Sequence, residues 1–262
     1  MEAIFCAYDR DKRGTLLPIE YTAPWNPQRA ETLASPMLVA FYRQGGIRKG
    51  LLVVERQRMY EGEPSTGHAE TAVVSVYIFR QNGAAWTIDQ AAEEALDAGT
   101  NGHAPGPELI QVGPDRFGLW FVGGARGQGY VNDYAYLVTM RETAIAEAGH
   151  FELGGNNSGA CSDDPKERGD FIHPCWEWSA TPDFIRTDGQ NDYLLRLTFT
   201  GTHAPDINDQ DKVAPRRGAV CYQSTSGGYK NVQDAKCGSY RGLDTREIFG
   251  VAEPVTTKPG LK

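Results

Sequence analysis

The chain has 262 residues, of which 40% are hydrophobic and 10% aromatic, so it can bury a sizeable core and is not a disordered chain. Its formal net charge of −8 excludes, on average, duplex nucleic acid and anionic membrane surfaces as partners. No run approaches the roughly 18 apolar residues that a membrane span needs.

Short runs of β-branched and aromatic residues, bounded by Gly, Asn, Asp and Pro, predict strands along most of the chain. A stretch over 141–153 is interpreted as a strand too, although its alanines also suit a helix. With 30 glycines and 15 prolines to make turns, the predicted fold is mainly β, with antiparallel β-sandwich or barrel-like sheets. The strand-like runs begin directly after Met1 and at Met37, Gly50, Thr71, Phe117, Tyr134 and Asp192.

One short helix is predicted over about 87–98, packed on a sheet. Thr87 has the position of an N-cap, and Gln90 follows three residues later as in a capping box. Ile88 and Leu96, together with the alanines between them, share one helical face, and Gly99 marks the end.

The domain organisation expected is a single β-rich domain over 1–252 with two lobes, followed by a flexible tail over 253–262. The boundary between the lobes is placed near 153–160. There the long cysteine-free part of the chain ends and the part that holds four of the five cysteines begins.

The spacing of these four cysteines predicts two disulfides rather than a zinc site. The pairs lie 14 and 16 positions apart in Gly-, Asn-, Asp- and Pro-rich segments, whereas zinc knuckles need two to four intervening residues. We therefore pair Cys161 with Cys175 and Cys221 with Cys237, and expect Cys6 to be a free core thiol.

Stapled loops in the C-terminal half predict an oxidising compartment, periplasmic or extracellular. Five reduced thiols in a cytosolic protein are the alternative. The opening "MEAIFCAYD" places a methionine directly before a strand, as in a chain trimmed of an export signal, and a signal peptide or lipid anchor is compatible with this start.

Motif searches predict no catalytic residue and no cofactor other than calcium. "GGARGQG" is interpreted as a glycine turn, no G-x-S-x-G elbow is present, and the five histidines are scattered. Two acidic loops have oxygen-rich calcium chemistry, but the EF-hand positions six and twelve hold Asp211 and Arg217, so turn capping is the simpler interpretation. The calcium candidates are Asp188, Asp192, Asp206, Asn208 and Asp211.

The segment between Cys161 and Cys175 is the main candidate for an interface. Its tip is too polar to pack inside, and its C-terminal end leads into two tryptophans that flank Glu177 and share one face of a strand. Those indoles form either a core pair beside the disulfide or an interface anchor. The interface candidates are Asp163, Asp164, Lys166, Glu167, Arg168, Trp176 and Trp178.

In general character, an acidic exported β protein with local disulfides and no catalytic motif is similar to bacterial periplasmic immunity proteins and hydrolase inhibitors. The resemblance transfers no residue. It implies a non-enzymatic binding protein whose stapled loop occludes a protein partner, and the negative charge favours a basic partner such as a secreted hydrolase or toxin. The alternative is a secreted hydrolase of glycans or cell wall, with carboxylates such as Glu177 in catalysis.

Overall fold

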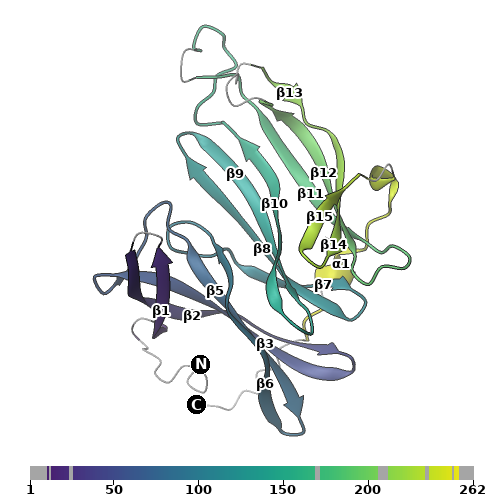
Figure 1. The fold of residues 1–262 in the computed structure, drawn as a ribbon. Coiled ribbons are helices and arrows are strands. Elements are labelled where there is room, and N and C mark those ends of the chain that lie inside the picture. Colours follow the sequence, from purple (N-terminus) through teal and green to yellow (C-terminus); the bar gives the residue numbers. More distant parts are fainter. Residues whose placement is uncertain are drawn as a thin grey trace.

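The computed structural model describes residues 11, 13–23, 26–168, 172–205, 212–233, 236–249 and 251–253, and folds them into two antiparallel sheets (Figure 1). The first sheet has the order β1-β2-β3-β5-β6, with β4 paired to β3. Its strands are β1 (Thr15–Ala23), β2 (Asn26–Gln44), β3 (Ile47–Tyr60), β4 (Glu63–Pro64), β5 (Ala72–Asn82) and β6 (Ala85–Ala98).

The second sheet has the order β15-β14-β12-β11-β10-β9-β8-β7, with β13 paired to β12, and it curls into an open half-barrel (Figure 1). The predicted mainly β, antiparallel fold is confirmed. Its strands are β7 (Pro107–Gly113), β8 (Arg116–Gly127), β9 (Tyr130–Met140), β10 (Ile145–Asn156), β11 (Glu177–Ile185), β12 (Leu194–His203), β13 (Ala214–Pro215), β14 (Gly218–Thr225) and β15 (Gly228–Val232).

The central strands of the first sheet are buried on both faces, which explains why they are continuous apolar runs in the sequence. On β3, Leu51 and Val53 pack into the core between the two sheets, whereas Leu52 and Val54 pack into a smaller cluster on the opposite face. The sandwich-like packing of the two sheets therefore depends on alternate residues of the same strand.

The curl of the second sheet encloses a core of its own. Trp120 lies at its centre, with Phe151 stacked on it and Phe184 edge-on to it. The short helix α1 (Thr245–Phe249) adds the buried side chain of Ile248. A single 3-10 turn, η1 (Cys237–Ser239), precedes this helix.

The helix predicted over 87–98 is wrong, because this segment is the edge strand β6. Two bulges explain the error. Between Val74 and Val76 the partners on β6 advance from Leu96 to Ala92, and a second register shift follows near Ile88. At the first shift four positions of β6 lie opposite two of β5, so the inward-facing Ala92 and Ala95 are three residues apart instead of two, which imitates a helical period. Ile88, at the second shift, is exposed.

Of the remaining sequence predictions, some concern residues that the structure describes and others concern residues outside them. The strand interpretation of 141–153 is confirmed from Ile145 onward, where β10 begins, whereas 141–144 form the turn between β9 and β10. The N-terminal run with Cys6 lies outside the described residues, and so does the expected tail except Glu253, whose N–H donates to the carbonyl of Phe41. Within the described part of the chain, no helix is long and apolar enough to cross a bilayer.

Two buried tyrosines make stability depend on pH in the alkaline range. Burial, reinforced by nearby Asp192 and Asp89 respectively, raises the pKa of Tyr229 and that of Tyr42 far above the ordinary value of 10. The hydroxyl of Tyr229 donates to the carbonyl of Tyr193 at 2.9 Å. The folded state therefore keeps these two protons at a pH where unfolded tyrosines lose them.

We expect the free energy of unfolding contributed by these tyrosines to be constant below pH 10 and to fall above it, by up to about 1.4 kcal/mol per pH unit for each. Urea titrations from pH 8 to about 11.5 measure this slope. The double variant Tyr42→Phe, Tyr229→Phe should fall less steeply than wild type. Parallel slopes for the two proteins would contradict the assignment.

Candidate functional site

Both predicted disulfides are confirmed. The bond from Cys161 to Cys175 closes the segment between β10 and β11, with the two Cα atoms 4.9 Å apart. The bond from Cys221 to Cys237 ties β14 to η1, and both of its residues are buried. The first bridge therefore fixes a loop at the surface, whereas the second fastens the 3-10 turn η1 to the second sheet.

The base of the first loop is fixed by Asn157, which is fully buried. Its Nδ2 donates to the carbonyl of Pro174 at 2.9 Å, and its Oδ1 accepts from the N–H of Trp176 at 2.8 Å. A short parallel bridge between Cys161 and His173 continues the pairing toward the tip. The loop therefore has a side-chain clamp, a disulfide and a backbone bridge in succession.

The charged tip is exposed, yet its conformation is fixed by its own hydrogen bonds. Ser162 Oγ donates to the Glu167 carboxylate at 2.7 Å, and Asp164 Oδ1 accepts from the N–H of Lys166 at 2.9 Å. Arg168 Nε donates to the carbonyl of Ser162 at 3.0 Å, and its Nη2 donates to that of Asp163. All five predicted interface residues of the tip thus lie together in one ordered turn at the surface.

The two tryptophans lie beneath this loop rather than on it. Trp178 is buried in the core of the second sheet, and the guanidinium of Arg216 covers its ring at 3.5 Å from the centroid. Trp176 is half-buried against the same core, and its ring centroid lies 6.3 Å from that of Tyr130. Glu177, the carboxylate named for the hydrolase alternative, is exposed at the start of β11.

The calcium candidates do not converge where the structure describes them. Asp188 is exposed, whereas Asp192 takes part in an ion-pair cluster with Arg116 and Arg141. Asp206, Asn208 and Asp211 lie outside the described residues. Among the residues that the structure describes, no three His, Cys, Asp or Glu side chains gather in a way that could hold a metal ion.

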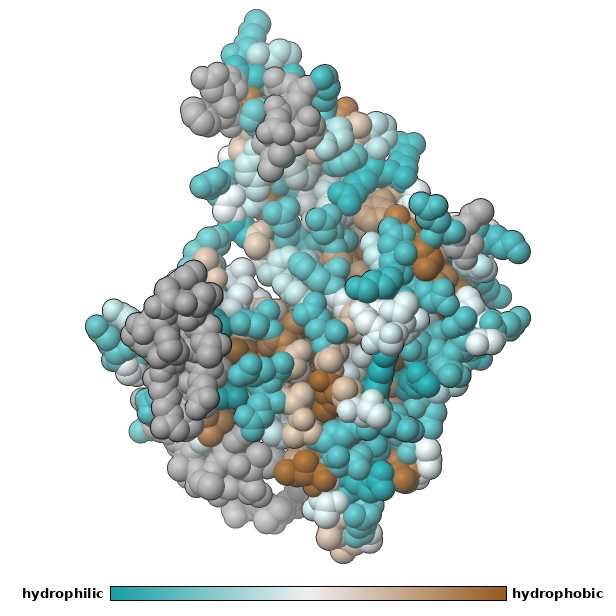
Figure 2. All heavy atoms as spheres, viewed as in Figure 1, coloured by the Kyte–Doolittle hydropathy of each residue, from teal (hydrophilic) through white to brown (hydrophobic). Residues whose placement is uncertain are grey.

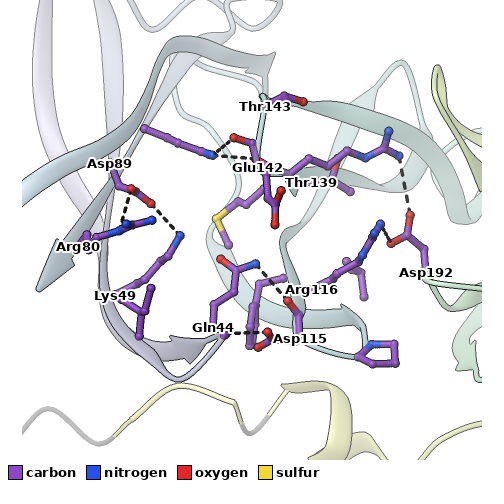
Figure 3. A pocket seen from close by; sticks show the side chains of 18 residues that line it. Gln44, Lys49, Arg80, Asp89, Asp115, Arg116, Thr139, Glu142, Thr143 and Asp192 are labelled. Carbon is purple, nitrogen blue, oxygen red and sulfur yellow. Dashed lines mark hydrogen bonds and ion pairs between the residues drawn. The ribbon is translucent and has the colours of Figure 1, made fainter.

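A second candidate site is a cleft of about 820 Å³ between the two sheets (Figure 3). The hairpin tips that line it lie away from the segment that joins β10 to β11 and holds the first disulfide (Figure 1). The cleft lies among the tips of the β2–β3 and β7–β8 hairpins, the strands β5 and β6, and the β9–β10 turn. The polar residues that line it are Gln44, Lys49, Arg80, Asp89, Gln90, Asp115, Arg116, Thr139, Arg141, Glu142, Thr143 and Asp192.

Each wall of the cleft carries a carboxylate held between two cations. On the first sheet, Asp89 accepts from Lys49 Nζ at 2.7 Å and pairs with Arg80 at 3.1 Å. On the second sheet, Asp192 pairs with Arg116 at 2.9 Å and with Arg141 at 3.9 Å. These clusters face the same cavity in Figure 3.

Hydrogen bonds tie the two sheets together around the mouth of the cleft. Gln44 Nε2 donates to the carbonyl of Asp115 at 3.1 Å, and the N–H of Gly45 donates to the Asp115 carboxylate at 2.6 Å. From the other side, Gln90 Nε2 donates to the carbonyls of Arg141 and Glu142 at 2.9 and 2.6 Å. The cleft is therefore a formed feature of the fold and not a loose gap.

The sequence predicted the loop but missed the cleft, because the cleft is assembled from segments up to about 150 positions apart with no local motif. In the view of Figure 2, the end of the molecule that carries the stapled loop shows mostly hydrophilic residues.

Comparisons with protein-family models, with curated proteins and with solved structures found no match.

Proposed function

We propose that this protein is an exported, non-enzymatic binding protein that neutralises a protein partner by occlusion, with the stapled loop as its binding element. The observation that carries the proposal is that the tip of this loop is exposed and charged, yet ordered by a disulfide and by Asn157 at its base. Inhibitory loops have this combination because a binding segment ordered in advance loses little conformational entropy on association.

The charges of the loop suggest the kind of partner. Asp163 and Asp164 place two carboxylates side by side at the tip, in a chain whose net charge is −8 with both of them counted. A basic surface would be attracted over long range, which accelerates association more than it strengthens the final complex. A basic secreted hydrolase or toxin fits this description.

The two disulfides support the proposed location. Such bonds persist in oxidising surroundings and are rare in the cytosol. A periplasmic or extracellular site of action is therefore part of the proposal, and it places the protein where secreted enzymes and toxins act.

Reversing both acidic residues of the tip, Asp163→Lys with Asp164→Lys, should leave the melting temperature within a few degrees. Both positions are exposed, and the one side-chain hydrogen bond lost, from the N–H of Lys166 to Asp164, contributes about 1 kcal/mol. Capture of partners from the producing organism's own exported fraction should nevertheless weaken. With the captured partner purified, association should slow at least several-fold at low salt and much less at high salt. Inhibition of the partner's activity should decrease in parallel.

The matched control reverses another vicinal acidic pair, Glu93→Lys with Glu94→Lys, which is exposed on β6 far along the chain from the loop. Its total charge equals that of the loop variant. Equal slowing by both double variants would assign the effect to net charge, and equal capture by wild type and the loop variant would show that the loop is only a structural staple.

The second candidate function is a secreted glycan hydrolase, favoured by the two lining carboxylates of the inter-sheet cleft that are not held between cations, Asp115 and Glu142. Glycoside hydrolysis requires two carboxyl groups on either side of the bond that breaks. Turnover of a glycan panel by the wild-type protein, abolished by Glu142→Gln, would establish this function in place of the binding protein.

A further inference from the structure

The cleft presents two guanidinium groups that the fold holds in position. Both oxygens of Asp192 are in use, since Oδ1 pairs with Arg116 and Oδ2 accepts from Ser224 Oγ at 2.5 Å. Both oxygens of Asp89 are likewise taken by Lys49 and Arg80. The two carboxylates are only 14% and 18% exposed, so they orient the cations rather than face a ligand.

The guanidinium groups themselves remain accessible. The side chains of Arg116 and Arg80 are each 43% exposed. Within the described part of the chain, the hydrogen bonds of the Arg116 guanidinium go to Asp192 alone, through Nη1. A guanidinium has five N–H donors in a planar fork that matches a carboxylate, so Arg116 retains the geometry needed to bind a second anion.

A negative group faces the same cavity. Glu142 is exposed, and Figure 3 shows its side chain directed into the cavity. Its carboxylate makes no hydrogen bond or ion pair with any residue that the structure describes, whereas its backbone is held in place by Gln90. The cleft thus offers a positioned cation and an unpaired carboxylate to whatever enters it.

The rest of the lining argues against a sugar as the ligand. Carbohydrate sites commonly combine polar groups with an exposed aromatic face, but Phe117 is the single aromatic residue that lines the described cavity, and it is buried against Tyr42. The volume of about 820 Å³ lies within the range of roughly 300–1,000 Å³ usual for small-molecule pockets.

We propose that the cleft binds a small zwitterion with a free amino and a free carboxyl group, of the class of amino acids and short peptides. The ligand's carboxylate would lie on Arg116 and its ammonium group near Glu142. This site goes beyond the proposed protein-binding function, because it lies at the opposite end of the molecule from the stapled loop (Figure 1).

The test uses calorimetric titration of the intact protein with tri-alanine, which carries both end charges and no side-chain charge. N-acetyl-tri-alanine lacks the ammonium group, and tri-alanine amide lacks the carboxylate. We expect saturable binding of tri-alanine, and affinity about ten-fold or more weaker for each blocked form. Free alanine, titrated in the same way, separates an amino-acid site from a peptide site.

Two variants test which residue binds the carboxylate of the ligand and which binds its ammonium group. Arg116→Gln should bind tri-alanine and its amide equally while still preferring the free amine, and Glu142→Gln should show the reverse pattern. Exposed Arg126 and Glu108 supply the matched controls Arg126→Gln and Glu108→Gln, which should bind like wild type. Since Glu142 is exposed and unpaired, its variant keeps the test valid even if Arg116→Gln lowers stability.

Three outcomes would overturn the proposal. The first is no saturable heat with tri-alanine or alanine up to about 10 mM. The second is equal affinity for the free and blocked peptides in the wild-type protein. The third is tighter binding of neutral maltotriose than of tri-alanine, which would assign the cleft to a glycan. None of these results depends on whether the stapled loop captures a protein.

Discussion

Asn157→Ala is expected to lower the free energy of unfolding by about 3 kcal/mol. The side chain is fully buried, and its loss leaves the N–H of Trp176 and the carbonyl of Pro174 without their partners. Buried polar groups left unpaired cost about 1–3 kcal/mol each, more than an ordinary hydrogen bond contributes. A urea titration monitored by tryptophan fluorescence measures the change.

The neighbouring variant Asn156→Ala is the control, because the Oδ1 of Asn156 accepts one exposed turn hydrogen bond, from the N–H of Ser158. It should cost well under about 1 kcal/mol. Amide hydrogen exchange should also accelerate around 158–168 in Asn157→Ala and not in Asn156→Ala. If the two variants lose the same stability, Asn157 is not the clamp of the loop.

Asp192→Ala should produce a loss of similar size, about 2–4 kcal/mol, at the other end of the molecule. This carboxylate is 14% exposed and binds Arg116, Arg141 and the hydroxyl of Ser224. Its removal leaves the Arg116 guanidinium and the hydroxyl of Ser224 without these partners, whereas Arg141 keeps its hydrogen bonds to Ser224 and Thr225. Thermal and urea unfolding of the purified variant measure the cost.

The comparison variant is Arg116→Gln, which should lose less, because Asp192 then keeps Arg141 and Ser224 as partners. The double variant Asp192→Ala, Arg116→Gln should be more stable than the sum of the two losses implies, since the groups share one cluster. Strict additivity would show that the cluster does not act as a unit.

Local patterns in the sequence predicted the strands and the disulfides because their causes are local. The runs at Gly50 and Thr71 became β3 and β5, whose central residues are buried on both faces and are therefore mostly apolar. The spacing of Cys161 from Cys175 reflects one closed loop between neighbouring strands. The helix prediction failed where a local pattern had another local cause, the bulges of β6.

The cleft could not be predicted because its causes are not local. Arg116 and Asp192 are 76 positions apart, and Lys49 and Asp89 are 40 apart. Each residue alone is an ordinary charged side chain beside a turn. Only the stacking of one sheet on the other brings them to a common cavity.

The bulges of β6 also bear on how readily the first sheet could pair edge to edge with another chain. β6 forms the outer edge of the first sheet, and it exposes Ile88 and Trp86. A long, regular and apolar edge is a template for pairing with another chain, the first step of aggregation. The bulge opposite Ser75, whose hydroxyl donates to the carbonyl of Glu93, interrupts the even spacing of N–H and C=O groups that an incoming strand would need.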